Sequence, residues 1–419
     1  MVILILKIYV WFVILLTTVY ILRQFIFSIN RLFGNQKMYY QDIFDSDLPP
    51  ISVFVPMHNE ELVAKNILES LINADYPKDK IEIIPINDHS TDGTQKILDK
   101  YAAKYPIIKP VERNEGRRGK PAAMNEVLLK TKNDIIIVFD ADYTPPKGIL
   151  RDIAVAFNDP EVGSVMGRVI PENVSSNLLT RLLDIERSGG YQVDQQARYN
   201  LGLVPQYGGT VGGFRKSYCM NTNSKQCFDP NILTEDTELT LKLFISGKKV
   251  VYANRLECYE EAPENFEVRG RQIKRWAQGH TQVLLRFIFL FLKSKNIGFL
   301  TKLDGVFLLS IYSLPPLFLG AVGALLVLFL AGEALYTLLL PLFFAVIAFN
   351  AFGNFSSFFQ IGIATFLDGS TYRIRLLPFM IINVFYNAFY LSDGFINAFA
   401  NHFLGKASTW QKTERFRKS

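Results

Sequence analysis

Two aspartates separated by one residue, Asp140 and Asp142, end the apolar run 135–139. Residues i and i+2 of an extended segment project to the same side, so both carboxylates can face one ligand. Such a pair can hold one hard divalent cation, because Mg²⁺ and Mn²⁺ prefer oxygen ligands and are commonly shared between carboxylates and a diphosphate. An Asp-x-Asp pattern is frequent by chance. Its place at the end of an apolar run nevertheless favours a site for Mg²⁺ or Mn²⁺.

A second acidic group, Glu235 and Asp236, follows Thr234 at the start of a predicted helix. Helix capping by Thr234, with acids in the first turn, would explain this pattern without any catalytic role. The alternative, which we favour, is that Asp236 is a general base. An inverting displacement at an anomeric carbon needs a carboxylate that takes the proton of the attacking hydroxyl. A diphosphate neutralised by a metal ion would then leave without an acid catalyst.

Polar loops also follow two other apolar runs. His58 and Glu60 come after residues 51–56, and Asp88 comes after residues 81–86. Taken singly, each loop is explained equally well by helix-capping residues. Acidic groups at three strand ends of one sheet edge would instead place several carboxylates in one crevice. That arrangement is costly unless a cation or a donor-rich ligand binds there.

A basic loop, Arg117-Arg118-Gly119-Lys120, precedes a predicted helix at 121–131. It can be read as a solvated loop. It can also be read as a phosphate-facing loop, because glycine permits close approach and a helix N-terminus favours an anion. In the second interpretation Lys120 lies nearest the diphosphate.

Residues 264–292 interleave arginine and lysine with aromatic and aliphatic residues, which is typical of a helix lying in a membrane interface. On this helix Gln272 shares a face with Arg275 and Trp276. A tryptophan face suits a sugar ring or a nucleotide, and an arginine suits a phosphate. A tryptophan that only anchors the helix at the interface is an open alternative.

Alternating strands and helices are expected to position these groups. The predicted strands are 51–56, 81–86, 135–140 and 162–169, and the predicted helices are 60–74, 93–104, 120–131 and 147–158. This alternation predicts βαβ units and a mostly parallel sheet covered on both faces. In such sheets ligands bind outside the carboxyl ends of the strands, where the acidic groups lie.

Both ends of the chain are strongly apolar. Residues 2–22 carry one charge, Lys7, and are long enough to cross a bilayer. The basic, acid-free flank of this segment predicts that its C-terminal end lies on the cytoplasmic side. Further crossings are expected at 303–331, 335–367 and 376–403, with a basic tail that also indicates the cytoplasm. Three crossings conflict with a tail and a central domain on the same side, so a fourth crossing or a re-entrant segment is left open.

Composition limits the functional classes. Hydrophobic residues make up 49% of the 419 residues and charged residues 20%, which excludes a disordered protein and argues against an ordinary soluble enzyme. A net charge of +6 is too small to indicate nucleic acid binding. The three cysteines have no metal-ligand spacing. Their odd count argues against a disulfide framework and suits a reducing compartment.

Taken together, the motifs resemble those of the inverting family 2 glycosyltransferases of the processive, membrane-embedded kind, such as cellulose, chitin, hyaluronan and poly-N-acetylglucosamine synthases. The Asp88 loop, Asp140-x-Asp142, Thr234-Glu235-Asp236 and Gln272-x-x-Arg275-Trp276 occur in that family's order. The resemblance implies an α/β fold of the GT-A (Rossmann-like) type with transmembrane and interface helices. The implied division is 1–33 for an N-terminal transmembrane helix, 48–260 for the catalytic domain, 262–297 for interface helices, 303–403 for a transmembrane bundle and 404–419 for a tail.

The resemblance also implies roles for single residues. Nucleotide-sugar binding would fall to Asp88, Lys120, Asp140, Asp142, His58 and Glu60, with Asp142 as the metal ligand. Catalysis would fall to Asp236 as base, beside Glu235. The acceptor and diphosphate would contact Gln272, Arg275, Trp276, Gly209 and Thr210. A gating segment in the tail would contain Trp410, Lys412, Thr413 and Arg415. Two positions depart from the family's pattern: His58 stands where that family often has a tyrosine that stacks on the base, and Asn87 replaces the first aspartate of its usual pair.

The hypothesis we favour is transfer of a sugar from a UDP-sugar onto a growing β-linked glycan that is exported across the cell membrane. Its partners would be the donor, the glycan, the lipid membrane and accessory or export subunits. The alternatives are transfer of one sugar to a membrane lipid, and a non-catalytic membrane subunit. Intact Asp140, Asp142 and Asp236 argue against the last of these.

Overall fold

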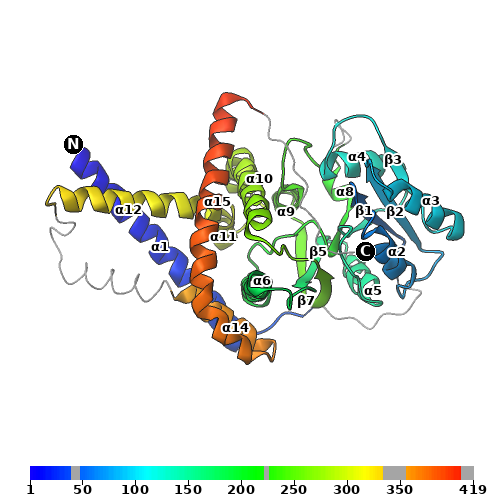
Figure 1. Ribbon diagram of the computed structural model, residues 1–419, viewed down its shortest axis with the longest axis horizontal. Coiled ribbons are helices and arrows are strands. Elements are labelled where there is room, and N and C mark those ends of the chain that lie inside the picture. The colour runs from blue at the N-terminus through cyan, green and yellow to red at the C-terminus, as the bar shows by residue number, and fades with distance from the viewer. Residues whose placement is uncertain (39–47, 221–225, 334–354, 407–419) are drawn as a thin grey trace.

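A computed structural model describes residues 1–38, 48–220, 226–333 and 355–406 of the chain. An α/β domain forms one end of the molecule, and long apolar helices extend from its other side (Figure 1). Long helices α10 and α15 lie between the two parts.

A seven-stranded mixed sheet forms the centre of the α/β domain, in the order β3-β2-β1-β4-β6-β5-β7. Strands β1, β2, β3 and β4 run parallel, β6 is antiparallel to both neighbours, and β5 is parallel to β7. The bounds are β1 Ile51–Met57, β2 Ile81–Asp88, β3 Val111–Arg113, β4 Ile135–Val138, β5 Val162–Pro171, β6 Gly212–Arg215 and β7 Lys249–Glu260.

The four predicted strands are therefore present, and three others were missed. Strand β3 has three residues, β6 begins with two glycines, and β7 mixes polar residues into its apolar pattern. None of these has the β-branched, apolar run on which the prediction relied.

Helices cover both faces of the sheet, which explains why its central strands are almost entirely apolar. One face packs against α2 Ala64–Ile72, α3 Thr94–Lys104 and α5 Ile149–Ala154. The other packs against α4 Lys120–Lys130 and α9 Glu235–Ile245. Between β5 and β6 the chain forms one long helical segment, composed of α6 Leu178–Ser188, a π-helical stretch η3 Gly189–Gln195 and α7 Gln196–Asn200.

In the described part of the chain, three helical segments are long and apolar enough to cross a membrane: Val2–Phe33, Phe299–Leu330 and Thr371–Leu404. The first is α1, the second joins α11 Phe299–Ser310 through η4 Ile311–Ser313 to α12 Leu314–Leu330, and the third joins η5 Thr371–Leu376 to α15 Leu377–Leu404. Of the crossing expected at 335–367, the described residues contain the short apolar helix α14 Ser356–Leu367. Residues 334–354 lie outside the described part.

Buried ion pairs connect the apolar helices to the α/β domain. Arg23 of α1 contacts Asp304 of α11 at 3.0 Å and Asp194 of η3 at 3.2 Å. Arg168 of β5 contacts Asp368, at the end of α14, at 2.7 Å. Removing one partner of such a pair leaves a buried charge and typically costs about 3–5 kcal/mol. The α/β domain and the apolar helices are therefore firmly connected.

Candidate active site

A cavity of about 810 Å³ opens at the carboxyl edge of the sheet. The parallel strands β1, β2 and β4 end there, and the loop before the antiparallel strand β6 arrives there. The predicted site residues that line it are His58, Glu60, Asp88, Lys120, Asp140, Asp142, Thr210, Glu235, Asp236, Gln272, Arg275 and Trp276. Segments far apart in the sequence thus meet at one place.

Asp236 lies in the first turn of α9, where its Oδ1 accepts the Thr237 backbone N–H at 2.7 Å. Burial, and next the charge of Glu235, raise the pKa of Asp236 to about 7. The Thr237 hydrogen bonds and the charge of Lys120 act in the opposite direction. A carboxylate with this pKa can take a proton from a hydroxyl near neutral pH and release it again.

Lys120, the first residue of α4, joins three segments of the site. Its Nζ contacts Asp140 at 2.7 Å and Glu235 at 3.5 Å, and donates to the carbonyl of Gly209 at 2.8 Å. Burial disfavours the charged ammonium, but these carboxylates outweigh it and raise the pKa of Lys120. The lysine is therefore a fixed positive charge in the cavity wall.

The loop before β6 contacts two acidic residues of the site, Asp236 and Asp140. Gly209 has a positive φ of 76°, and a Cβ added there would lie 3.2 Å from the Cβ of Asp236. Glycine alone combines this backbone conformation with so close an approach. The next residue, Thr210, accepts the backbone N–H of Asp140 at 3.1 Å through its hydroxyl. The position of Gly209 thus depends on having no side chain.

Asp88 is held by several donors. Its Oδ1 contacts Arg113 at 2.5 Å and His89 at 2.8 Å, and its Oδ2 accepts the N–H of Gly119 at 2.7 Å. A carboxylate offers about four acceptor positions, so one remains for a ligand. Asp88 therefore also attaches the basic loop to the sheet. Arg113 was not predicted as a site residue, because it ends the three-residue strand β3, which was not predicted either.

Asp142 has 5% of its surface exposed and lines the cavity, as do Glu260 and Glu261. The neighbouring Tyr143 donates to Glu260 at 2.6 Å, and Arg187 also contacts Glu260. Within the described ranges, no group of three or more His, Cys, Asp or Glu side chains is arranged to hold a metal ion. A cation at this wall would therefore need part of its coordination from a ligand.

The expected interface segment contains one helix, α10 Phe266–Lys293, whose Gln272, Arg275 and Trp276 line the cavity. Arg269 lies behind them. It donates to Gln272 at 2.9 Å and to Glu186 of α6 at 2.6 Å, and its guanidinium lies 5.1 Å from the centre of the Trp276 ring. Both Arg269 and Glu186 also line the cavity, and neither was predicted.

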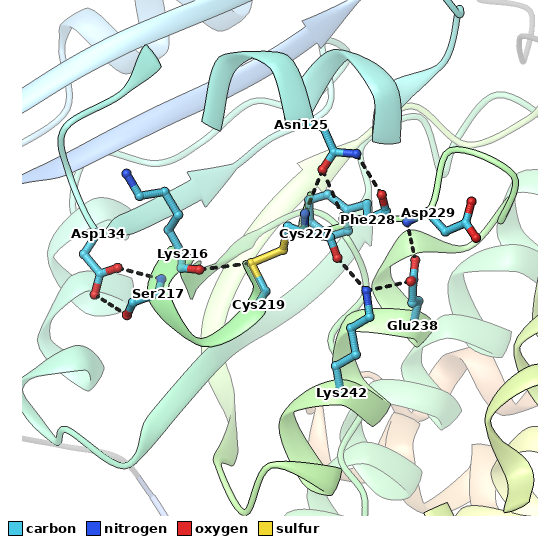
Figure 2. The surroundings of a disulfide bond; sticks show 10 residues. All are labelled: Asn125, Asp134, Lys216, Ser217, Cys219, Cys227, Phe228, Asp229, Glu238 and Lys242. Carbon is cyan, nitrogen blue, oxygen red and sulfur yellow. Dashed lines mark hydrogen bonds and ion pairs between the residues drawn. A yellow bond between two sulfur atoms is a disulfide. The ribbon is translucent and has the colours of Figure 1, made fainter. Parts of the chain in front are cut away.

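The segment that leads into Glu235 is anchored by a disulfide between Cys219 and Cys227 (Figure 2). The odd count argued against a disulfide framework, but it did not foresee this single bridge, which leaves Cys258 as a buried free thiol. Asn125 fixes the same segment by accepting the backbone N–H groups of Cys227 and Phe228, each at 3.0 Å. Residues 230 and 232–234, just beyond, line the cavity.

Thr234 occupies the N-cap position of α9 but makes no capping hydrogen bond there. Glu235 and Asp236 nevertheless lie in the first turn of α9, where a helix N-terminus favours acids, so this part of the alternative explanation stands beside the catalytic one. The remaining predicted residues Trp410, Lys412, Thr413 and Arg415 lie outside the described part of the chain, as does the rest of the segment 407–419.

Residues 52–219 match the sequence model of a family described as "Glycosyl transferase family 2". The chain is also similar to the probable glycosyltransferase YdaM of Bacillus subtilis (strain 168), with 35% identity over 60% of each chain. It is 32% identical to a beta-monoglucosyldiacylglycerol synthase of Synechocystis sp. over 73% of this chain and 62% of that protein. With a poly-beta-1,6-N-acetyl-D-glucosamine synthase of Staphylococcus aureus (strain COL), identity is 28% over 66% of this chain and 64% of that protein.

The chain spans less than two thirds of the length of each of these relatives. Among solved structures, it is similar to the mannosyltransferase PcManGT from Pyrobaculum calidifontis, described in complex with GDP-Man and Mn²⁺. The TM-score is 0.56 with 19% identity, over 89% of this chain and 97% of that one. This likeness confirms the predicted fold: a mostly parallel GT-A, Rossmann-like sheet with apolar helices attached.

Proposed function

We propose that the chain is an inverting glycosyltransferase that moves a sugar from a UDP-sugar onto a growing β-linked glycan at a membrane surface. The observation that carries the proposal is the single cavity in which Asp236, with its raised pKa, lies beside Lys120 and the two acidic groups that follow β4. A base, a fixed positive charge and a place for a cation are the parts that displacement of a diphosphate requires.

The donor would bind along the ends of β1, β2 and β4. Asp88, His58 and Glu60 would contact the nucleotide, and Lys120 would face the diphosphate. Asp140 and Asp142 fit a hard cation that is shared with the diphosphate, because they offer oxygen ligands on one wall but do not complete a coordination sphere. When bound, Mg²⁺ or Mn²⁺ supplies positive charge to the leaving diphosphate.

In the reaction, an acceptor hydroxyl attacks the anomeric carbon from the face opposite the diphosphate. The new carbon–oxygen bond forms as the bond to the diphosphate breaks, and that electron pair stays on the diphosphate oxygen. Asp236 takes the hydroxyl proton, and its burial, together with the charge of Glu235, keeps the pKa of Asp236 high enough for the task. Inversion at this carbon would give a β-linkage from an α-linked donor.

The acceptor would lie on the α10 side of the cavity. Gln272, Arg275 and Trp276 line the cavity that contains Asp236, as does Thr210, while Gly209 lies against Asp236 without lining the cavity itself. A tryptophan face that binds a terminal sugar lets a polymer stay bound between additions, which supports processive synthesis. Trp410, Lys412, Thr413 and Arg415 would form a gating segment.

The membrane arrangement follows from the charges that flank α1. Arg23 and Arg31 lie at its end nearest the α/β domain, which predicts a cytoplasmic catalytic domain in a multi-pass protein of the cell membrane. A hydrophilic polymer cannot cross about 30 Å of hydrocarbon unaided, so export would use this protein's helices together with accessory subunits.

Transfer of a single sugar to a membrane lipid is a second candidate, and two observations favour it. Identity is higher to the beta-monoglucosyldiacylglycerol synthase than to the poly-N-acetylglucosamine synthase. In addition, only 11–17% of the most apolar stretches of the three candidate spans is buried, so the described helices enclose little between them.

Product size separates the two candidates. The purified protein in lipid would be offered a panel of radiolabelled nucleotide-sugars with Mg²⁺ or Mn²⁺, with and without diacylglycerol. A polymer that a β-specific hydrolase degrades supports processive synthesis, whereas a labelled lipid bearing one sugar supports the second candidate. No transfer from any donor contradicts both.

A further inference from the structure

The chain enters α15 at the surface of the α/β domain. Asp368, just after α14, contacts Arg168 of β5 at 2.7 Å and accepts the hydroxyl of Ser188 at 2.6 Å. Five residues further on, Arg373 contacts Asp184 of α6 at 2.5 Å. The N-terminal end of α15 is therefore held on the same side of any membrane as the catalytic site.

From there α15 runs along α10 and also contacts α6 of the α/β domain. Asn383 donates to Glu186 at 2.5 Å, and Tyr386 donates to the carbonyl of Phe266 at 2.5 Å. Further along, Asp393 contacts Lys274 at 2.5 Å. These contacts extend over about 15 Å of helix at 1.5 Å per residue. Figure 1 shows α15 beside α10 and running across α12.

Charged groups lie at the level of this contact. Glu267 and Arg271 of α10 pair with each other, and their side chains are 77% and 38% exposed. Lys274 and Asp393 are 34% and 50% exposed. A charge at the centre of a bilayer costs about 2.5–3.5 kcal/mol even on the most lenient scale. This stretch of α15 therefore belongs outside the hydrocarbon core.

The contacts of helices α1 and α12 differ from those of α15. They pack on each other, with Tyr9 donating to the carbonyl of Leu317 at 2.8 Å and Val10 packing near Leu328. At their far end Lys7 pairs with Glu333 at 2.8 Å. From Lys7 to Arg23 the helix rises about 24 Å, close to the thickness of a bilayer core.

The outward face of α15 is apolar along its whole length. Residues spaced three, four or seven apart form one stripe, and each is between 43% and 70% exposed: Ile382, Phe385, Phe389, Ile396, Phe399 and Phe403. Asn383, Tyr386 and Asp393 make their contacts with α6 and α10 from the neighbouring flank of the helix, so the exposed apolar stripe faces away from the protein, as expected for a helix in the membrane interface.

We propose that α15 does not cross the membrane but lies in its plane, with this stripe in the leaflet nearest the catalytic domain. The side chains of the stripe contact lipid at the boundary between headgroups and acyl chains. Residue 406 then lies on the same side as the catalytic domain, which removes one of the three C-terminal crossings expected from the sequence. The proposal rests on the packing of α15 and is independent of the sugar chemistry.

Depth measurements test the proposal directly. Single cysteines at Ile382, Phe389 and Phe403 would carry a nitroxide in the reconstituted protein, and oxygen and a polar nickel complex would report depth. An interfacial helix places all three at one shallow depth. A crossing helix separates the first from the last by about 30 Å, and that result overturns the proposal, as do three water-exposed labels. Phe318 and Phe329 of α12 are the control pair, with an expected separation of about 16 Å along the helix.

Sidedness gives a second readout. Exposed positions Lys132, Ala331 and Lys406 would each be changed to cysteine and treated with a membrane-impermeant maleimide in sealed vesicles. We expect Lys406→Cys to react from the same side as Lys132→Cys, and Ala331→Cys from the other side. Reaction of Lys406→Cys together with Ala331→Cys contradicts the proposal. The unchanged protein measures background, because its cysteines are bridged or buried.

Discussion

Replacing Arg269 by alanine should impair use of the acceptor while leaving nucleotide binding intact. Arg269 is 2% exposed, and its guanidinium contacts Glu186, Gln272 and the Trp276 ring at once. A hydrogen bond to a charged group contributes about 1.5–3 kcal/mol, and a partly desolvated cation–π contact adds about 1 kcal/mol. Because Glu186 is about one third exposed, the lower end of these ranges applies.

We therefore expect about 2–3 kcal/mol less stability and at least a tenfold loss of kcat/KM for the acceptor, since 1.4 kcal/mol corresponds to a factor of ten. Arg271, two residues away, is the matched control, because its side chain is 38% exposed and its pair with the exposed Glu267 lies at the surface. Arg271→Ala should stay within about 0.5 kcal/mol and twofold in activity. Acceptor titrations, UDP binding by calorimetry and thermal unfolding would be measured for both variants.

Two outcomes would refute this reasoning. Equal losses in the two variants would mean that general charge, and not the position of Gln272 and Trp276, determines the effect. A parallel fall in UDP affinity for Arg269→Ala would mean that the arginine belongs to the donor site. Arg269→Lys should restore stability in part but not acceptor use, because an ammonium lacks the planar fork.

Three other predictions concern the donor site and its supports. Chelation of divalent metal should abolish transfer, and full activity in excess EDTA would contradict a role for Asp140 and Asp142 in holding a cation. The pKa of Asp236 is raised to about 7, so kcat/KM should fall as pH decreases through about 7 and the base becomes protonated; a flat profile from pH 5 to 8 would exclude this assignment. Cys219→Ser should lower the free energy of unfolding by about 2.5 kcal/mol, from the loop closed by the disulfide, and an equal melting temperature with and without reductant would show that the bridge does not form in solution.

The parallel part of the fold could be predicted because its strands are buried on both faces and therefore read as apolar runs. The ends of these runs also predict that Asp88, Asp140 and Asp142 share one edge of the sheet, and all three line the same cavity. Strand β6 could not be predicted in this way, because its glycines are selected by close backbone contact and not by burial of side chains.

The contacts that support the site residues could not be predicted from the sequence, for a different reason. Arg269 and Glu186 lie 83 positions apart, and no local pattern relates them. The disulfide depends on a Cα separation of 4.9 Å that the loop between the cysteines determines. Length and apolar content are the same for a spanning helix and an interfacial one, so the sequence alone does not separate the crossing expected at 376–403 from the interfacial position that we propose for α15 on its contacts with α10.

The central claim is that Asp236 removes the proton of the acceptor hydroxyl. It is tested most directly by measuring single-turnover transfer and UDP affinity of Asp236→Asn on the same preparation. We expect transfer to fall by about 10²–10⁴-fold, the usual contribution of a general base, with UDP affinity changed by less than about threefold. Transfer that survives, or UDP affinity that falls as far as transfer does, would contradict the account.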